Sequence, residues 1–113
     1  MAYDLSFWKY EEGKTNVHEE VYARLSDGEV VQGVANLPIE EIKKDVALQF
    51  KDWERLDEYH FVKEDEAIEV YMTDQFVRFD CYGVSEEDMN RLIDIMLAYD
   101  CCLYDSAINV RFE

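Results

Sequence analysis

Hydrophobic and polar residues alternate along residues 67–73 and again along 76–82, which is the period of two half-buried β-strands. Only two polar residues separate the runs, so together they predict a β-hairpin. Ser85 follows as a helix N-cap, with Asp88 three positions later. Apolar residues then recur every three or four positions until Ala98, which predicts an amphipathic helix. This stretch therefore predicts a hairpin that leads into a helix packed on its sheet.

The first half of the chain predicts one strand and two helices. Residues 3–10 alternate between apolar and polar side chains and predict the first strand. Asn16 is placed to cap a short helix that ends at the turn 26–28, and residues 29–36 predict an irregular connection. A second helix is predicted over residues 38–53, with a proline in its first turn, where the missing N–H costs nothing.

Shorter elements complete the predicted order. Residues 55–59 are interpreted as the exit from the second helix, and residues 60–62 as a short edge strand or an extended loop. A charged turn occupies 63–66, and strands are predicted at 101–104 and 108–112. The order β-α-α-(β)-β-β-α-β-β predicts an α+β, ferredoxin-like fold, an antiparallel sheet of four to five strands with helices packed on one face.

Length and composition predict one cytoplasmic domain spanning residues 1–113. The chain has 113 residues, of which 49% are hydrophobic, enough for one core. It has no apolar run long enough to span a membrane, and its N-terminus lacks the regions of a signal peptide. Three cysteines and two histidines, without metal-ligand spacing, predict free thiols in a reducing compartment, no metal and no cofactor.

Acidic charge is the strongest feature of the composition. The chain has 27 acidic and 11 basic residues, a net charge of −16, and its last 50 positions carry 13 acidic residues and 3 basic ones. Such a charge repels phosphate backbones, which excludes nucleic-acid binding, and it attracts basic proteins. Solubility is the alternative explanation. The two densest clusters supply candidate partner contacts, which are Glu64, Asp65, Glu66, Glu86, Glu87 and Asp88.

One face of the predicted sheet carries several aromatic residues. Exposed aromatic side chains are typical anchors of a partner-binding surface. The similar layout that stacks RNA bases is excluded here, because the flanking charge is acidic and the basic-aromatic motif is missing. Alternatively, one of the first two helices or a second subunit covers this face and makes the aromatic residues part of a core. The face comprises Trp8, Tyr71, Phe76, Arg78, Asp80 and Tyr82.

Catalytic chemistry has weaker support. Cys81, Cys101 and Cys102 supply thiols, but no motif links them to His18 or His60 as a base. Neighbouring cysteines in an apolar strand are typical of small buried residues. Carboxylates are too numerous for one acid–base pair to be singled out. No catalytic residue is therefore assigned from the sequence.

Three short segments carry a resemblance to known families. They are residues 3–8 (Tyr-Asp-Leu-Ser-Phe-Trp), residues 33–39 (Gly-Val-Ala-Asn-Leu-Pro-Ile) with Trp53, and residues 103–105 (Leu-Tyr-Asp). Together they resemble small bacterial proteins, several families of which are immunity proteins of polymorphic toxin systems. In these relatives Pro-Gln often follows the last Asp, where this chain has Ser-Ala. The resemblance implies a cytoplasmic protein that binds and neutralises a toxin, and it assigns no functional residue by position.

Three functions are consistent with the sequence. The first is a non-enzymatic acidic protein, monomer or homodimer, that occludes a basic partner such as a toxin nuclease. The second is a small cofactor-free enzyme with a titratable group in a cleft. The third is a structural module in which two aromatic faces pair into a dimer. The charge and the aromatic face favour the first.

Overall fold

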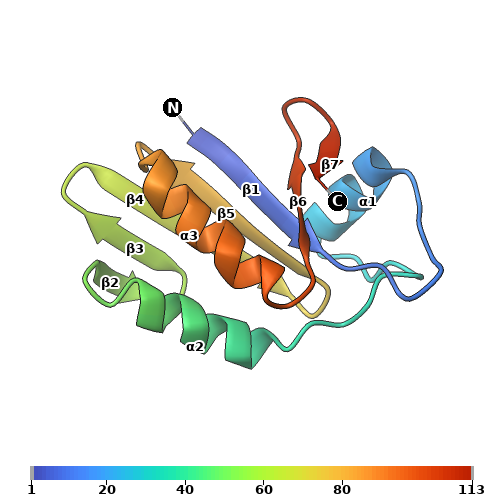
Figure 1. Cartoon of the computed structure of the whole chain (residues 1–113), viewed down its shortest axis with the longest axis horizontal. Helices are drawn as coiled ribbons and strands as arrows, with labels where there is room; N and C mark the ends of the chain where they lie inside the picture. Colours follow the sequence, from blue (N-terminus) through green and yellow to red (C-terminus); the bar gives the residue numbers. More distant parts are fainter. Residues whose placement is uncertain (1, 113) are drawn as a thin grey trace.

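The computed structural model describes residues 2–112, which fold into three helices and one seven-stranded antiparallel sheet. The strand order across the sheet is β2-β3-β4-β5-β1-β6-β7 (Figure 1). The helices are α1 (His18–Ser26), α2 (Ile39–Gln49) and α3 (Glu86–Leu97). The strands are β1 (Ala2–Trp8), β2 (Glu54–Asp57), β3 (His60–Lys63), β4 (Glu66–Thr73), β5 (Phe76–Tyr82), β6 (Cys102–Asp105) and β7 (Val110–Phe112).

The predicted hairpin and its helix are present. β4 pairs with β5 along its length, and the Ser85 side chain caps α3 by accepting a hydrogen bond from the backbone N–H of Asp88. α2 and α3 cross the same face of the sheet, as Figure 1 shows. The alternating apolar residues of β1, β4 and β5 point to this side and form the main core with the apolar stripes of both helices. An α+β fold is therefore confirmed.

The predicted sheet of four to five strands is wrong, because the part of the chain that the structure describes contributes seven. α2 ends at Gln49, and the residues interpreted as its exit form β2 at the edge of the sheet. All four side chains of β2 are exposed, so the strand has no apolar alternation to reveal it. Phe50 and Trp53 are buried beyond the helix end, with ring centroids 5.5 Å apart.

The prediction that the helices pack on one face is wrong for α1, which lies on the opposite face from α2 and α3. Val21 and Leu25 of this helix pack with Trp8, Phe76 and Tyr104 in a second core. The predicted cap at Asn16 is wrong, because the helix begins at His18 and its N-cap is Val17. The Asn16 side chain accepts a hydrogen bond from the backbone N–H of Val17 at 2.8 Å. Helices thus pack on both faces of the sheet.

Gln75 fastens the irregular connection of residues 29–36 beneath this second core. Its side-chain oxygen accepts from the Val31 N–H at 2.8 Å, and its amide nitrogen donates to the carbonyls of Val31 and Val34 at 3.0 and 2.9 Å. Gln75 is only 6% exposed. One side chain therefore satisfies three buried backbone groups of a segment more than 40 positions away in sequence.

β1 occupies the interior of the sheet, between β5 and β6. Its pairing places the first residues of the chain beside strands from the last third. The Tyr3 hydroxyl donates to Asp105 at 2.8 Å across this junction. No helix among the described residues is long and apolar enough to cross a membrane.

Candidate functional surface

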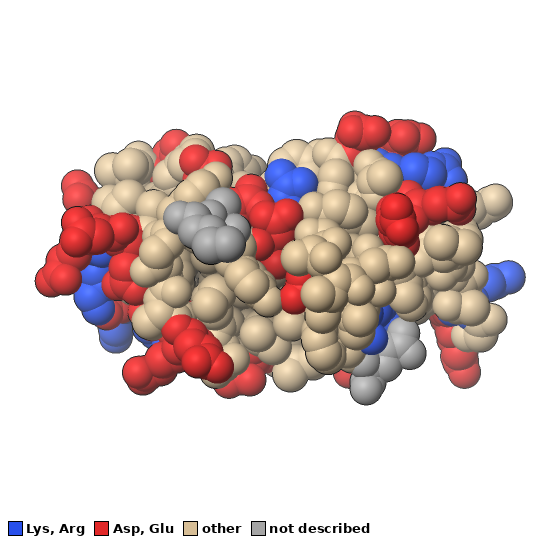
Figure 2. Space-filling model, turned by 90° about the horizontal axis from the view of Figure 1, so that it is seen from above, with Lys and Arg blue, Asp and Glu red and all other residues tan. Residues whose placement is uncertain are grey.

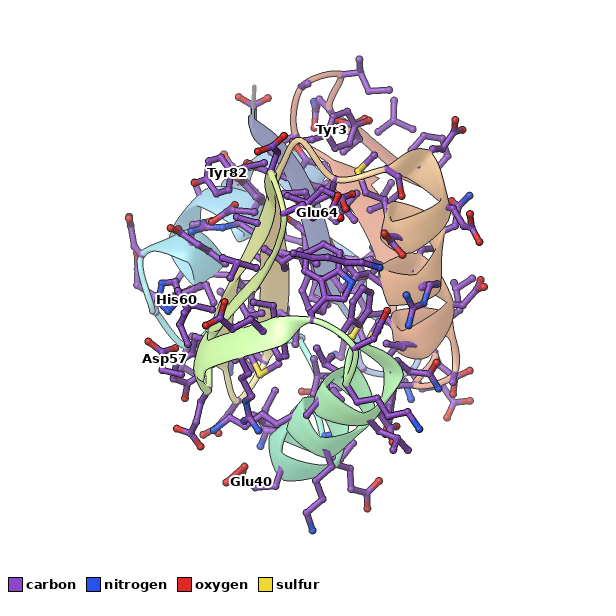
Figure 3. The ribbon with its side chains drawn as sticks, turned by 90° about the vertical axis from the view of Figure 1, so that its left-hand side faces the viewer. Tyr3, Glu40, Asp57, His60, Glu64 and Tyr82 are labelled. Carbon is purple, nitrogen blue, oxygen red and sulfur yellow. The ribbon has the colours of Figure 1, made fainter. Side chains whose placement is uncertain are left out.

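The two predicted acidic clusters meet at one end of the molecule. The carboxylate of Glu66, at the start of β4, accepts a hydrogen bond from the backbone N–H of Ser85 at 3.0 Å. Gly83 lies so close to the 64–66 turn that a Cβ there would stand 3.3 Å from the carbonyl oxygen of Asp65. Residues 64–66 and 86–88 therefore form one surface, the acidic end, and Figure 3 labels Glu64 in the turn before β4.

Most of the charge at the acidic end is uncompensated. Glu64, Asp65, Glu86 and Glu87 are exposed, and no ion pair joins them to a lysine or arginine within residues 2–112. Asp88 is the exception, because it pairs with Arg91 at 2.9 Å. In the space-filling view from above, red carboxylate groups outnumber blue basic ones (Figure 2). The acidic end therefore carries a negative potential available to a basic group in solution.

An apolar groove opens beside the acidic end, between α3 and strands β1 and β6. This α3–β6 groove has a volume of about 340 Å³. Tyr3 on its floor is 46% exposed, and Glu86 of the acidic end stands on its rim. The hydrogen bond to Asp105 raises the pKa of the Tyr3 hydroxyl, which stays neutral at physiological pH. The groove is lined by Tyr3, Leu5, Glu86, Met89, Asn90, Ile93 and Leu103.

The predicted aromatic face is largely covered. Trp8 and Phe76 are fully buried beneath α1, with the Trp8 ring 5.1 Å from that of Tyr104 and 6.3 Å from that of Phe76. Tyr71 is half-buried, with the Arg78 guanidinium 5.1 Å from its ring centroid. The structure agrees with the alternative of a covering helix for Trp8 and Phe76, which are core residues. Among the predicted aromatic residues Tyr82 is the one that is exposed, by 38%.

The sheet register forms a carboxyl pair that the sequence did not single out. Asp4 of β1 stands directly opposite Asp80 of β5, on the face covered in part by α1. The Tyr22 hydroxyl donates to Asp4 at 3.1 Å, and Arg78 lies 3.2 Å from Asp80. Burial raises the pKa of the Asp80 carboxyl, Arg78 opposes this rise, and the nearby Asp4 adds to it. Only the pairing of two distant strands reveals this acid pair.

We expect the carboxyl of Asp80 to titrate above the ordinary range of aspartate. The folded state binds the proton of Asp80 more tightly than the unfolded chain does. The protonated carboxyl therefore contributes to the free energy of unfolding at low pH, and this contribution is lost as pH rises through the pKa of the folded state. Asp4→Asn should lower the Asp80 midpoint, measured by NMR of the carboxyl carbon. Asp27→Asn, at an exposed site, is the control. An unchanged midpoint in Asp4→Asn would show that the two carboxyls do not interact.

The cysteines are free thiols, and two of them are deeply buried. Burial raises the pKa of Cys81 to about 12 and that of Cys101 to about 11, so both thiols are protonated at neutral pH. Cys102 is half-buried. Both histidines bond to other residues: His18 to the Tyr10 hydroxyl at 2.8 Å and His60 to Asp57 at 2.7 Å. The Asp57 carboxylate raises the pKa of His60.

We expect Cys102 to react with a thiol reagent more than about 100-fold faster than Cys81 and Cys101 in the folded protein, because burial disfavours their thiolates. Mass spectrometry after brief labelling measures this difference. All three cysteines should react in denaturant. Cys102→Ser should leave the folded protein almost unlabelled, and rapid labelling of this variant would contradict the buried placement of the other two thiols.

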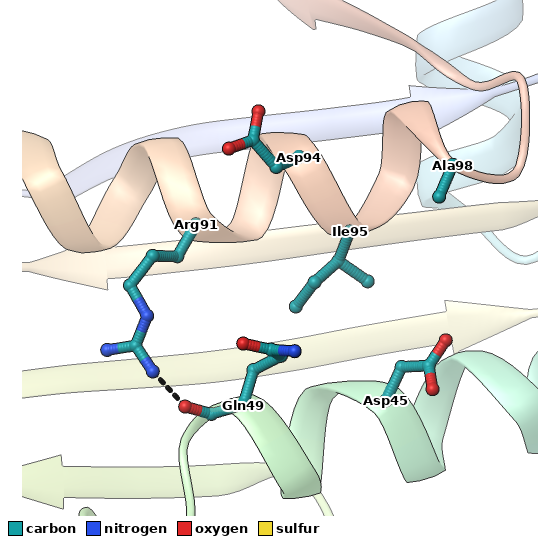
Figure 4. Close-up of a pocket in the computed structure, with 6 residues that line it drawn as sticks. All are labelled: Asp45, Gln49, Arg91, Asp94, Ile95 and Ala98. Atoms are coloured by element: carbon teal, nitrogen blue, oxygen red, sulfur yellow. Dashed lines mark hydrogen bonds between the residues drawn. The ribbon is translucent and has the colours of Figure 1, made fainter.

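A second cleft, between α2 and α3, is spanned by Arg91 (Figure 4). Its guanidinium donates to the backbone carbonyl of Gln49, pairs with Asp88 and lies 4.3 Å from the centroid of the Phe50 ring. Arg91 thus holds the end of α2 against α3. Within residues 2–112 no group of three His, Cys, Asp or Glu side chains is arranged to hold a metal ion.

Searches against models of protein families and against curated proteins find no match to this chain.

The sequence did not single out the residues that line the α3–β6 groove as site candidates. Tyr3 and Leu5 alternate in a strand, and Met89 and Ile93 belong to a helical stripe, so their spacing indicates a core. Tyr3, Met89 and Ile93 are partly exposed because of the position at which α3 crosses the sheet. Local sequence spacing does not predict that position.

Proposed function

We propose that this protein is a non-enzymatic, acidic binding protein whose acidic end caps a basic partner, such as a toxin nuclease neutralised by an immunity-type inhibitor. The observation that carries this proposal is the meeting of two acidic clusters, with four exposed carboxylates that lack an ion pair among the described residues. In this mechanism the carboxylates stand where substrate phosphates would lie and occlude the groove that binds them. The resemblance of three segments to immunity proteins agrees with it.

We also infer that β1, α2, β4, β5, α3 and β6 form a ferredoxin-like unit. The support is the order β4-β5-β1-β6 in an antiparallel sheet. α2 lies in the connection from β1 to β4, and α3 lies in the connection from β5 to β6. β2, β3, β7 and α1 are then additions to this unit. The proposed location is the cytoplasm, which the three free thiols favour.

The test is affinity capture from an extract of the source cell, followed by binding of the purified captured protein. The bait variant combines four substitutions at the acidic end, and the matched control removes the same charge from exposed sites elsewhere. The acidic-end variant is Glu64→Gln, Asp65→Asn, Glu86→Gln and Glu87→Gln. The control is Glu11→Gln, Glu12→Gln, Asp27→Asn and Glu41→Gln, all at exposed carboxylates.

We expect the wild-type chain and the control to retain a basic protein that dissociates at about 1 M salt, where charges are screened beyond about 3 Å. The acidic-end variant should retain it at least about tenfold more weakly, because it loses the steering charges. The proposal fails if no captured protein depends on these four carboxylates, or if the control variant loses as much binding as the acidic-end variant.

The Asp4–Asp80 pair favours a small cofactor-free enzyme as a second candidate function. A carboxyl with a raised pKa beside another carboxyl is an arrangement used for general acid catalysis. Both carboxyls already have protein partners, in Tyr22 and Arg78. For this reason the binding function remains the better supported of the two.

A further inference from the structure

The sheet extends beyond α3 and leaves one face of β6 and β7 without a covering helix (Figure 1). Phe7, Leu103 and Phe112 are neighbours across β1, β6 and β7, so they share the face on which α2 and α3 pack. Phe7 is fully buried there, whereas Phe112 is 51% exposed. The floor of the α3–β6 groove therefore continues as an apolar surface toward the edge of the sheet.

α3 supplies the opposite wall of the groove. Met89, Ile93 and Leu97 follow one another at intervals of four, so they lie along one side of the helix. Leu97 is 49% exposed and extends the wall beyond the residues that line the groove itself. The eight-residue rise from Met89 to Leu97 is about 12 Å, which matches about two turns of a docked helix.

The charges around the groove indicate which kind of partner it can bind. Among the residues that the structure describes, its lining contains one acidic side chain, Glu86, and no lysine or arginine. Glu86 also belongs to the acidic end, so the apolar surface and the unpaired carboxylates adjoin. A second copy of this chain would bring another net charge of −16 to the same place, which opposes pairing of two such surfaces. An apolar segment flanked by basic residues complements both features.

We propose that the α3–β6 groove docks an amphipathic helix of the basic partner, with its apolar side chains against Ile93 and Leu103 and its lysines or arginines at the acidic end. Helices that bind in grooves use apolar residues at successive turns as anchors, which fits two facing rows of apolar side chains. This inference rests on the proposed function, since one partner supplies both the apolar anchors and the basic residues.

The experiment uses the full chain and a synthetic probe, a helical peptide of leucine and lysine with leucines at i, i+3, i+4 and i+7. The control peptide has the same composition in a scrambled order, so it has the charge without the apolar ridge. Titrations followed by NMR report both the affinity and the amides that shift. We expect the ridged peptide to bind at least about tenfold more tightly than the scrambled one, with shifts along α3 and β6.

Two leucines give a matched pair of variants. Leu97→Gln changes the groove wall and should weaken the ridged peptide about tenfold, whereas Leu48→Gln should have no effect. Both leucines are surface residues in the last turn of their helices, exposed by 49% and 62%. Ile93→Gln is a second groove variant, and thermal unfolding of each variant checks that binding is compared between folded proteins.

The possible results separate this inference from the proposed function. Equal binding of both peptides, weakened only by the acidic-end variant, would overturn groove docking and leave the acidic binding protein standing. If binding of the ridged peptide depended on Leu97 and Ile93 but not on the acidic end, the result would support docking in the groove and contradict a basic partner. Self-association of the chain that Ile93→Gln abolishes would assign the groove to a second copy and overturn the proposed occupant.

Discussion

Replacing Trp8 with alanine is expected to lower the free energy of unfolding by about 3–5 kcal/mol, the usual cost of removing a large buried aromatic side chain. Trp8 is fully buried and its ring lies among those of Tyr104, Phe76 and Tyr10. The Arg111 guanidinium also stands 5.4 Å from its centroid. Urea unfolding monitored by circular dichroism, with the fluorescence of Trp53 as a second probe, measures the change.

This substitution also distinguishes the two explanations of the aromatic face. Tyr82→Ala, on the same face but beyond α1 and 38% exposed, is the control and should cost less than about 1 kcal/mol. If Trp8→Ala lowered the free energy of unfolding as little as Tyr82→Ala, α1 would not cover this face of the sheet. The aromatic residues would then be available to a partner, and the acidic end would not be the sole candidate surface.

Replacing Gln75 with alanine is expected to cost about 3 kcal/mol or more. The change removes three hydrogen bonds at once and leaves the N–H and carbonyl of Val31 and the carbonyl of Val34 without that partner. Each buried polar group left unpaired costs about 1–3 kcal/mol, although water entering the site would recover part of this. Urea unfolding gives the total, and amide hydrogen exchange at Val31 should speed up most.

The matched control is Gln32→Ala, in the same connection but with an exposed side chain. It should change the free energy of unfolding by less than about 0.5 kcal/mol. If Gln75→Ala were as mild as Gln32→Ala, the connection of residues 29–36 would be held by its apolar contacts alone. Loss of this connection would open the second core, because Val31 and Val34 belong to it together with Trp8 and Phe76.

Local signals were enough to predict the hairpin and α3. The alternation through Val70 and Phe79 and the cap at Ser85 are each complete within a few residues, and the structure has all of them. β2 was not predicted, because all four of its side chains are exposed and show no apolar alternation. Only its pairing with β3 makes it a strand. Phe50 and Trp53 continued the helical spacing of α2 by chance, since both are buried from a turn.

The candidate surface depended on information that no local pattern contains. Both acidic clusters were visible in the sequence, but their meeting requires the turn before β4 to lie against Ser85. The α3–β6 groove joins Tyr3 to Ile93, which are far apart in the chain. Periodicity also cannot say which face of a sheet a helix covers, so the burial of Trp8 beneath α1 became evident only from the tertiary structure.

The interior position of β1 has a consequence for how the protein is made. Residues 2–8 are synthesised before their partners in β5 and β6, whose residues come much later in the sequence. Until then Leu5, Phe7 and Trp8 have no sheet to join, and pairing between such distant segments is slow. The nascent chain must therefore keep the apolar residues of β1 from aggregating until β5 and β6 have been synthesised, a period in which its many carboxylates favour solubility.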